Sequence, residues 1–169
     1  MRPTPGRWPL AAVLAVVLAA AVALGAGTGA LQWQVQSQHD SDEARQRSVQ
    51  AARDTTVAIL SYTADNVDRD LGARTDRLTG AFLDEYSTLM NTQVIPGAKQ
   101  NGMSAMAEVR AASAVTVTPD RAVTLLFVDQ TITKPVSDGP AAPAKSAFSV
   151  RVTLDRAGDR WLVSGFEPV

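Results

Sequence analysis

The sequence predicts an α+β fold in which two or three helices precede three or four antiparallel strands. Apolar or small side chains recur at steps of three and four between residues 49 and 89, which is the period of an amphipathic helix. After residue 107 the period changes to two, which is typical of strands with one covered face. Turn residues separate the later segments, so we expect a meander whose curved sheet packs on the helices.

The first element expected is a membrane-spanning helix over residues 8–31. The run from Trp8 to Leu31 is 24 residues long and carries no charge, and Arg2 and Arg7 precede it. A helix of this length reaches about 36 Å, enough to cross a hydrocarbon core of about 30 Å. All 17 acidic residues lie at or beyond Asp40. The positive-inside rule therefore predicts a cytoplasmic N-terminus and an extracytoplasmic remainder, with the anchor in the cytoplasmic membrane.

A cleaved signal peptide is the alternative interpretation of the same run. Arg2 and Arg7 would form its basic region, and Thr28 to Ala30 would form a small-residue cleavage site. The apolar stretch is longer than the roughly 7 to 15 residues of a typical signal peptide, which favours the anchor. The cytoplasmic N-terminus is then residues 1–7, the stalk is residues 32–40, and the exported domain is residues 41–169. Cleavage would instead give a secreted domain.

Two helices are expected at the start of the exported domain. Asp40, followed three residues later by Glu43, approximates a capping box and predicts that a helix begins here. The apolar or small residues of its stripe are Val49, Ala52, Thr56, Ile59, Leu60, Thr63 and Val67. A second, shorter helix is indicated by Leu78, Phe82, Tyr86 and Leu89. Pro96 and Gly97 are expected to interrupt the chain after it, and residues 101–102 to form a turn.

The strands are expected to begin with residues 107–117, where covered and uncovered positions alternate. A turn containing Pro119 leads to an antiparallel strand over Ala122–Thr133. Residues 125–128 of that strand are apolar on both faces, which predicts burial by helices on one side and by a partner or curled sheet on the other. After a proline-containing loop at 134–145, strands follow at 146–154 and 160–166.

The composition excludes several classes of function. The chain carries 16 basic and 17 acidic side chains and has no basic run, which argues against nucleic-acid binding. It has no cysteine and one histidine, so we expect no disulfide, thiol nucleophile or zinc site. The acidic residues form no calcium loop, and no glycine-rich phosphate loop is present. The sequence therefore predicts neither a metal nor a cofactor.

The order of elements resembles the nuclear transport factor 2-like (NTF2-like) cone, whose sheet curls to leave an apolar hollow beside the helices. Three segments together are similar to the Mce-associated membrane proteins of actinobacteria. Their matching residues are Leu60 and Tyr62 in the first segment, Leu78, Thr79, Gly80, Phe82 and Tyr86 in the second, and Trp161 and Val163 in the third. These motifs are packing signatures, and the likeness covers nearly the whole chain. The loop at 135–143 and the short stalk depart from the family's pattern.

The resemblance implies a single-pass accessory subunit of an Mce lipid-import system, with an exported NTF2-like (SnoaL-like) domain. It implies the membrane, Mce proteins and their permeases as partners, and lipid as a further ligand. A second hypothesis is a lipid- or sterol-binding module that uses the cone hollow. The side chains expected to line the hollow, or otherwise to fill the core, are Leu78, Phe82, Phe127, Phe148 and Trp161.

A third hypothesis is an isomerase or cyclase, because enzymes of the NTF2-like superfold use a carboxylate in an apolar pocket as a proton-transfer base. Asp129 is the candidate, since it follows the most apolar strand segment. Its polar neighbours instead favour a solvated carboxylate. Tyr62 and Tyr86 could donate to an oxyanion, but their helical spacing favours core packing. His39 is isolated in the stalk, so we expect no catalytic residue.

Overall fold

The computed structural model describes residues 41–135 and 143–169. The expected cytoplasmic N-terminus at 1–7, membrane span at 8–31 and stalk at 32–40, with His39, lie outside the described residues. Within the two described ranges, no helix has the length and apolar character needed to cross a bilayer. Residues 41–169 form a compact unit of their own, and the fold and site below belong to that unit.

The described chain begins with a helix over residues 41–60, which confirms the predicted start. The helix ends before Thr63 and Val67, which were expected to continue its stripe, and Val67 begins the next helix. Its buried face follows helical spacing through Ser48, Ala52, Thr56 and Ile59. The charged residues lie on other faces, where Glu43 pairs with Arg47 one turn later at 2.5 Å. This helix therefore packs on the core through small side chains, which allow a close approach.

A series of shorter helical elements follows. They are α2 (Val67–Gly72), the 3-10 turn η1 (Thr75–Arg77), α3 (Gly80–Leu89), the π-helical turn η2 (Met90–Val94) and α4 (Ile95–Asn101). The expected interruption at Pro96 and Gly97 is wrong, because the chain stays helical through both residues. Pro96 lies in the first turn of α4, where a missing N–H is tolerated, and the wider π turn precedes it. The turn expected at residues 101–102 is confirmed at Gly102, which ends α4 with φ of 61°.

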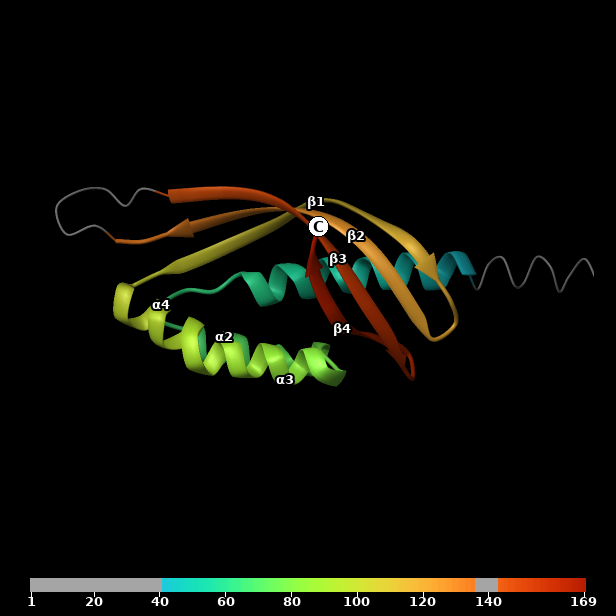
Figure 1. Ribbon diagram of the computed structural model, residues 1–169, viewed down its shortest axis with the longest axis horizontal. Coiled ribbons are helices and arrows are strands. Elements are labelled where there is room, and N and C mark those ends of the chain that lie inside the picture. The colour runs from blue at the N-terminus through green and yellow to red at the C-terminus, as the bar shows by residue number, and fades with distance from the viewer. Residues whose placement is uncertain (1–40, 136–142) are drawn as a thin grey trace, which may run out of the picture. The chain divides into compact units, whose positions relative to one another are not determined.

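Four strands complete the chain as an antiparallel meander. They are β1 (Ser104–Val117), β2 (Arg121–Thr133), β3 (Pro143–Ala157) and β4 (Arg160–Pro168), in the order β1-β2-β3-β4. The predicted turn between the first two is confirmed, with the Thr118 N–H donating to the Arg121 carbonyl at 2.8 Å. Bulges interrupt the β1-β2 register between Val109 and Ala111 and again near Val115. Bulges bend a strand, and the sheet curves around the helices (Figure 1).

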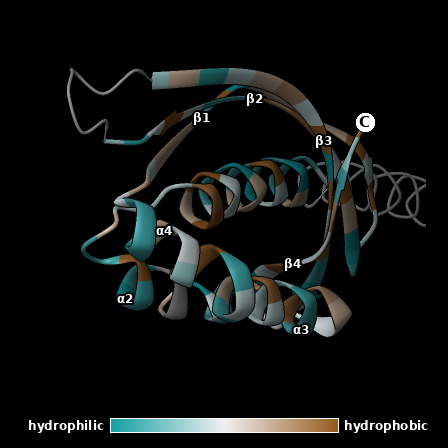
Figure 2. Ribbon diagram, turned by 60° about the vertical axis from the view of Figure 1, so that its left-hand side comes forward, coloured by the Kyte–Doolittle hydropathy of each residue, from teal (hydrophilic) through white to brown (hydrophobic). Residues whose placement is uncertain are grey.

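The helices cover one face of the curved sheet, and the core lies between the two layers (Figures 1 and 2). Alternate residues of the two central strands supply its centre: Leu126, Val128, Val150, Val152 and Leu154 are all almost fully buried. Trp161 and Val163 of β4 complete the sheet's share of the core. The predicted α+β class, with helices packed on a curved antiparallel sheet, is confirmed.

Candidate interaction surface

Four of the five side chains expected around an apolar hollow lie in or against the core. Leu78 and Trp161 are buried, and Phe82 and Phe148 are half-buried against the core. Phe82 also stacks on Phe166 of β4, with ring centroids 6.0 Å apart. These four residues contribute to one core between the helices and the sheet, at different places along it.

Phe127 does not belong with this group. Its side chain is 50% exposed, whereas its neighbours Leu126 and Val128 are buried. Successive residues of a strand point to opposite faces, so Phe127 lies on the face turned away from the helices. We call this the outer face of the sheet. The expectation that Phe127 lines the hollow is therefore wrong, and no curled sheet among the described residues buries this face of its strand. Burial of the face by a partner stays a prediction.

The first of the family-motif segments joins the 41–60 helix to the sheet. Tyr62 and Ala105 exchange backbone hydrogen bonds of 2.8 and 2.9 Å, which pair the chain after the helix with β1. The Leu60 carbonyl accepts a hydrogen bond from Gln130 Nε2 at 3.2 Å. Burial raises the pKa of the Tyr62 hydroxyl. These contacts give the segment a structural role.

The second and third motif segments meet at the opposite edge of the sheet. Leu78 forms a parallel bridge with Val163, and the Thr79 N–H donates to the Val163 carbonyl at 2.9 Å. Gly80, which begins α3, adopts φ of 62°, a left-handed conformation that glycine adopts readily. The motif therefore fixes α3 against β4.

Tyr86 packs inside the core and is unsuited to a donor role at an open site. Its side chain is 5% exposed, and its hydroxyl has no hydrogen-bond partner among the described residues. Burial raises its pKa to about 12, and the nearby positive charge of Arg74 partly opposes that rise. Asp129, in contrast, lies on the outer face. The structure does not bring this carboxylate and this hydroxyl into one site.

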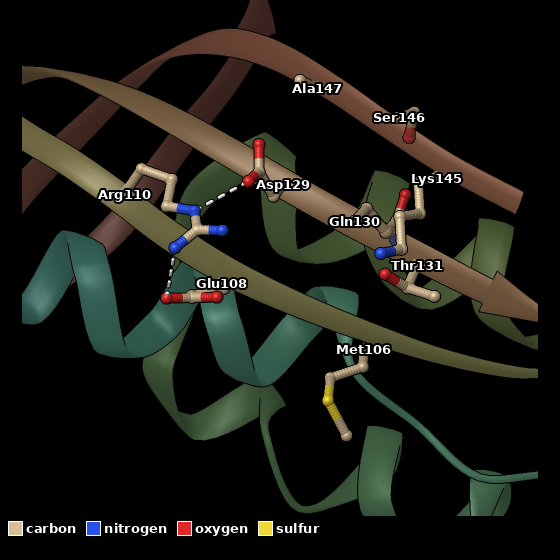
Figure 3. Close-up of a pocket in the computed structure, with 9 residues that line it drawn as sticks. All are labelled: Met106, Glu108, Arg110, Asp129, Gln130, Thr131, Lys145, Ser146 and Ala147. Carbon is tan, nitrogen blue, oxygen red and sulfur yellow. Dashed lines mark hydrogen bonds and ion pairs between the residues drawn. The ribbon is translucent and has the colours of Figure 1, made fainter. Parts of the chain in front are cut away.

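Asp129 belongs to an ion cluster on the outer face. Arg110 Nε donates to Asp129 Oδ2 at 2.7 Å, and Arg110 Nη1 lies 3.2 Å from Glu108 Oε1, so the guanidinium joins two carboxylates (Figure 3). The hydrogen bond to Asp129, followed by the charge of Glu108, raises the pKa of Arg110. The solvated interpretation of Asp129 is confirmed, because its side chain is 43% exposed and ion-paired. This carboxylate is a partner of a cation, not a desolvated base.

The cluster lines a shallow hollow of about 430 Å³ across β1, β2 and β3. Met106 stands at one end of it, and Lys145 at the side formed by β3 (Figure 3). Met106 is 72% exposed, and Phe127 follows beyond the ion cluster on the same face. Met106 and Arg110 are not among the site residues predicted from the sequence, although the period of two places them opposite the buried Ala107 and Val109.

The edge of the sheet at β1 is partly covered by the 41–60 helix and the chain just after it. Arg53 Nη1 donates to the Val109 carbonyl at 2.8 Å, and the Ala107 N–H donates to Ser61 Oγ at 3.0 Å. Such cover reduces the backbone groups that an added strand could use. No described element covers the outer face (Figure 1). The outer face is therefore the open surface of the sheet.

The arrangement suits association better than chemistry. Within the described residues, no three His, Cys, Asp or Glu side chains come together as a metal site. Protein interfaces are enriched in aromatic residues, Met and Arg, which are the residue types that the outer face exposes. We therefore take the outer face, defined by Met106, Glu108, Arg110, Phe127 and Asp129, as the candidate interaction surface.

The fold is shared with bacterial secretion proteins of low sequence identity. An IcmL-like type IV secretion system protein of Legionella pneumophila has a TM-score of 0.53 and 10% identity, over 72% of this chain and 88% of that chain. VirB8 of Agrobacterium tumefaciens has a TM-score of 0.54 and 15% identity, over 70% of this chain and 87% of that chain. At such identities the likeness shows the fold alone.

No family model matches the sequence. Two proteins of Mycobacterium tuberculosis (strain ATCC 25618 / H37Rv) are nevertheless similar to it. Uncharacterized protein Rv1362c is 40% identical over 138 residues, which are 82% of this chain and 61% of that protein. Outer membrane protein Rv1973 is 52% identical over 141 residues, which are 83% of this chain and 86% of that protein. The chain belongs to the family of Outer membrane protein Rv1973 of Mycobacterium tuberculosis.

Proposed function

We propose that the protein is a non-enzymatic, membrane-anchored accessory subunit that stabilises or adapts an Mce-type lipid-import complex in the cell envelope. The observation that carries this proposal is the uncovered outer face, where Phe127 and Met106 expose apolar surface beside the Arg110 ion cluster. A relative named as an outer membrane protein supports an envelope location. The resemblance of the motif segments to Mce-associated proteins supports the choice of complex.

The partner would bury Phe127 and Met106 while the ion cluster remains at the rim. Apolar anchors surrounded by polar residues are the usual anatomy of a protein interface. Arg110 is already neutralised by Glu108 and Asp129, so the partner needs no strong charge opposite it. Because the helices lie on the other side of the sheet, docking here requires no rearrangement of the core.

The test is affinity capture of the full-length protein from native membranes after mild solubilisation. We expect Mce proteins and their permeases to be recovered with the wild-type chain, and to be lost with Phe127→Asp or Met106→Asp. Leu89→Asp is the matched control, because Leu89 is 44% exposed but lies on α3. Recovery of the wild-type chain alone would contradict the proposed partner. Equal recovery by the outer-face variants and the control would contradict the proposed surface.

The membrane part of the proposal is a single N-terminal anchor with residues 1–7 inside and the domain outside the cytoplasmic membrane. Protease added to sealed right-side-out vesicles should remove the domain and spare the N-terminus. N-terminal sequencing distinguishes a retained anchor from cleavage after Ala30. Fractionation should find the chain with the cytoplasmic membrane, and recovery in the outer membrane fraction would contradict that location.

A further inference from the structure

An open groove lies between the 41–60 helix and β1, on the opposite side of β1 from the outer face. Its volume is about 580 Å³. The residues that line it are Arg53, Asp54, Val57, Ala58, Arg77, Ala107, Glu108 and Val109. We call it the Arg77 groove. A second hollow of about 500 Å³ shares Asp54 and Arg77 with it and extends to Trp161.

Half of the residues lining the Arg77 groove are apolar, and all but one of the charged ones already have partners. Arg53 is bonded to the Val109 carbonyl, and Asp54 accepts a hydrogen bond from Gln50 Nε2 at 2.8 Å. Glu108 is paired with Arg110 on the outer face. The remaining charged group is the guanidinium of Arg77.

Arg77 differs from the other arginines of residues 41–135 and 143–169. Each of the others makes a side-chain hydrogen bond or ion pair with another described residue, and Arg77 makes none. Its backbone is nevertheless fixed. The Arg77 N–H donates to the Arg74 carbonyl at 3.1 Å, and the next residue, Leu78, is buried and bridged to Val163. The turn that carries Arg77 is thus anchored, and its side chain lines the groove.

We propose that the Arg77 groove binds an amphipathic anion, a molecule with a carboxylate or phosphate head group on an alkyl chain. The planar guanidinium matches two oxygens of either head group. The apolar side chains of Val57, Ala58 and Val109 accept the alkyl chain, since pockets commonly combine apolar walls with a few polar groups that fix orientation. The adjoining hollow continues the path toward Trp161. The Arg77 groove shares Glu108 alone with the residues that define the outer face, and this proposal does not depend on the docking role.

The test uses the full-length protein in phosphatidylcholine nanodiscs and dodecanoic acid that carries a photoreactive diazirine on its chain. We expect cross-links to map to residues 53–58 and 107–109. Arg77→Ala should lower the apparent affinity for the probe about tenfold, seen as reduced labelling at a fixed probe concentration. Arg47→Ala is the matched control, because Arg47 lines the adjoining hollow but is paired with Glu43. Dodecanol with the same diazirine should label these residues far less. Competition by unlabelled dodecanoic acid or dodecyl phosphate identifies the preferred head group.

Three outcomes would overturn the proposal. Equal labelling of wild-type protein and Arg77→Ala would mean that the guanidinium binds no head group. Equal labelling by the acid and the alcohol would mean apolar adsorption without recognition. Cross-links confined to residues 8–31 would mean that the acid stays in the bilayer.

Val57→Asp is a second variant, which should prevent the alkyl chain from binding against the apolar wall. Near-ultraviolet circular dichroism reports whether either variant alters the fold. Capture of partner proteins should be unchanged by Arg77→Ala, so this proposal and the docking role can fail independently.

Discussion

Replacing Tyr86 with phenylalanine should make the protein more stable. The Tyr86 hydroxyl is buried without a hydrogen-bond partner among the described residues. Burial of an unpaired hydroxyl costs about 1–3 kcal/mol in proteins. Tyr86→Phe removes that cost and keeps the ring beside Phe82, 6.2 Å away between centroids. We expect the free energy of unfolding to rise by about 1 kcal/mol near neutral pH, at the low end of that range because the oxygen's packing contacts are lost.

The same variant should change how stability depends on pH. Burial raises the pKa of Tyr86 from 10.0 to about 12 in the folded state, so the folded state keeps a proton that the unfolded state loses. The stabilisation linked to this proton is complete below about pH 10 and is lost as the pH rises toward 12. Two pKa units correspond to at most about 2.7 kcal/mol. Tyr86→Phe removes this group's share of the alkaline loss.

The assay is urea unfolding of the full-length protein in detergent at several pH values between 7 and 11.5, followed by tryptophan fluorescence. Trp161 lies in the core and should report the transition. Tyr62→Phe is the control for the gain at pH 7, since Tyr62 is only half-buried. It does not serve as a control above pH 10, because burial also raises the pKa of Tyr62. If Tyr86→Phe lowered the free energy of unfolding at pH 7 by 1 kcal/mol or more, the hydroxyl would have a stabilising partner and the reasoning would be refuted. If the free energy of unfolding of Tyr86→Phe fell with alkaline pH as steeply as that of the wild-type protein, the raised pKa of Tyr86 would be refuted.

Three further substitutions test other parts of the fold. Leu126→Ala should lower the free energy of unfolding by about 3–5 kcal/mol in the same urea assay, because this fully buried side chain would leave a cavity at the centre of the core. Gly102→Ala should cost about 1–2 kcal/mol, because φ there is +61° and a Cβ would meet Pro135 Cγ at 3.0 Å; no loss would contradict the conformation of this turn. Arg53→Met should cost about 1 kcal/mol and speed amide exchange along β1, measured by mass spectrometry, because it removes the donor to the Val109 carbonyl; unchanged exchange would contradict that edge contact.

The elements governed by local rules could be predicted from the sequence. The turn before Arg121 follows from Pro119, and the helix over 41–60 follows from its apolar stripe. Pro96 was misread because a proline can end a helix or start one, and only the preceding π turn of η2 shows which applies. The spacing of the apolar residues does not show whether Pro96 ends a helix or begins one.

The candidate surface could be predicted only in part. The period of two in β1 determines that Met106 and Arg110 share one face and that Val109 has the other. It does not determine which face the helices cover when both are apolar, as around Phe127, because that depends on curvature and on contacts between distant segments. The pairing of Arg110 with Asp129 depends likewise on the bulged register between β1 and β2.

The sequence alone determined the order of elements, the antiparallel connections and the helical and strand periods, because these depend on neighbouring residues. The tertiary structure decided that Leu78, Phe82, Phe148 and Trp161 join the core while Phe127 stays exposed. It also left the Arg77 guanidinium without a partner among the described residues, at a groove lined by apolar residues of the helix and β1. Such features arise where segments far apart in the chain meet, and the energy of each contact depends on which partner the fold brings to it.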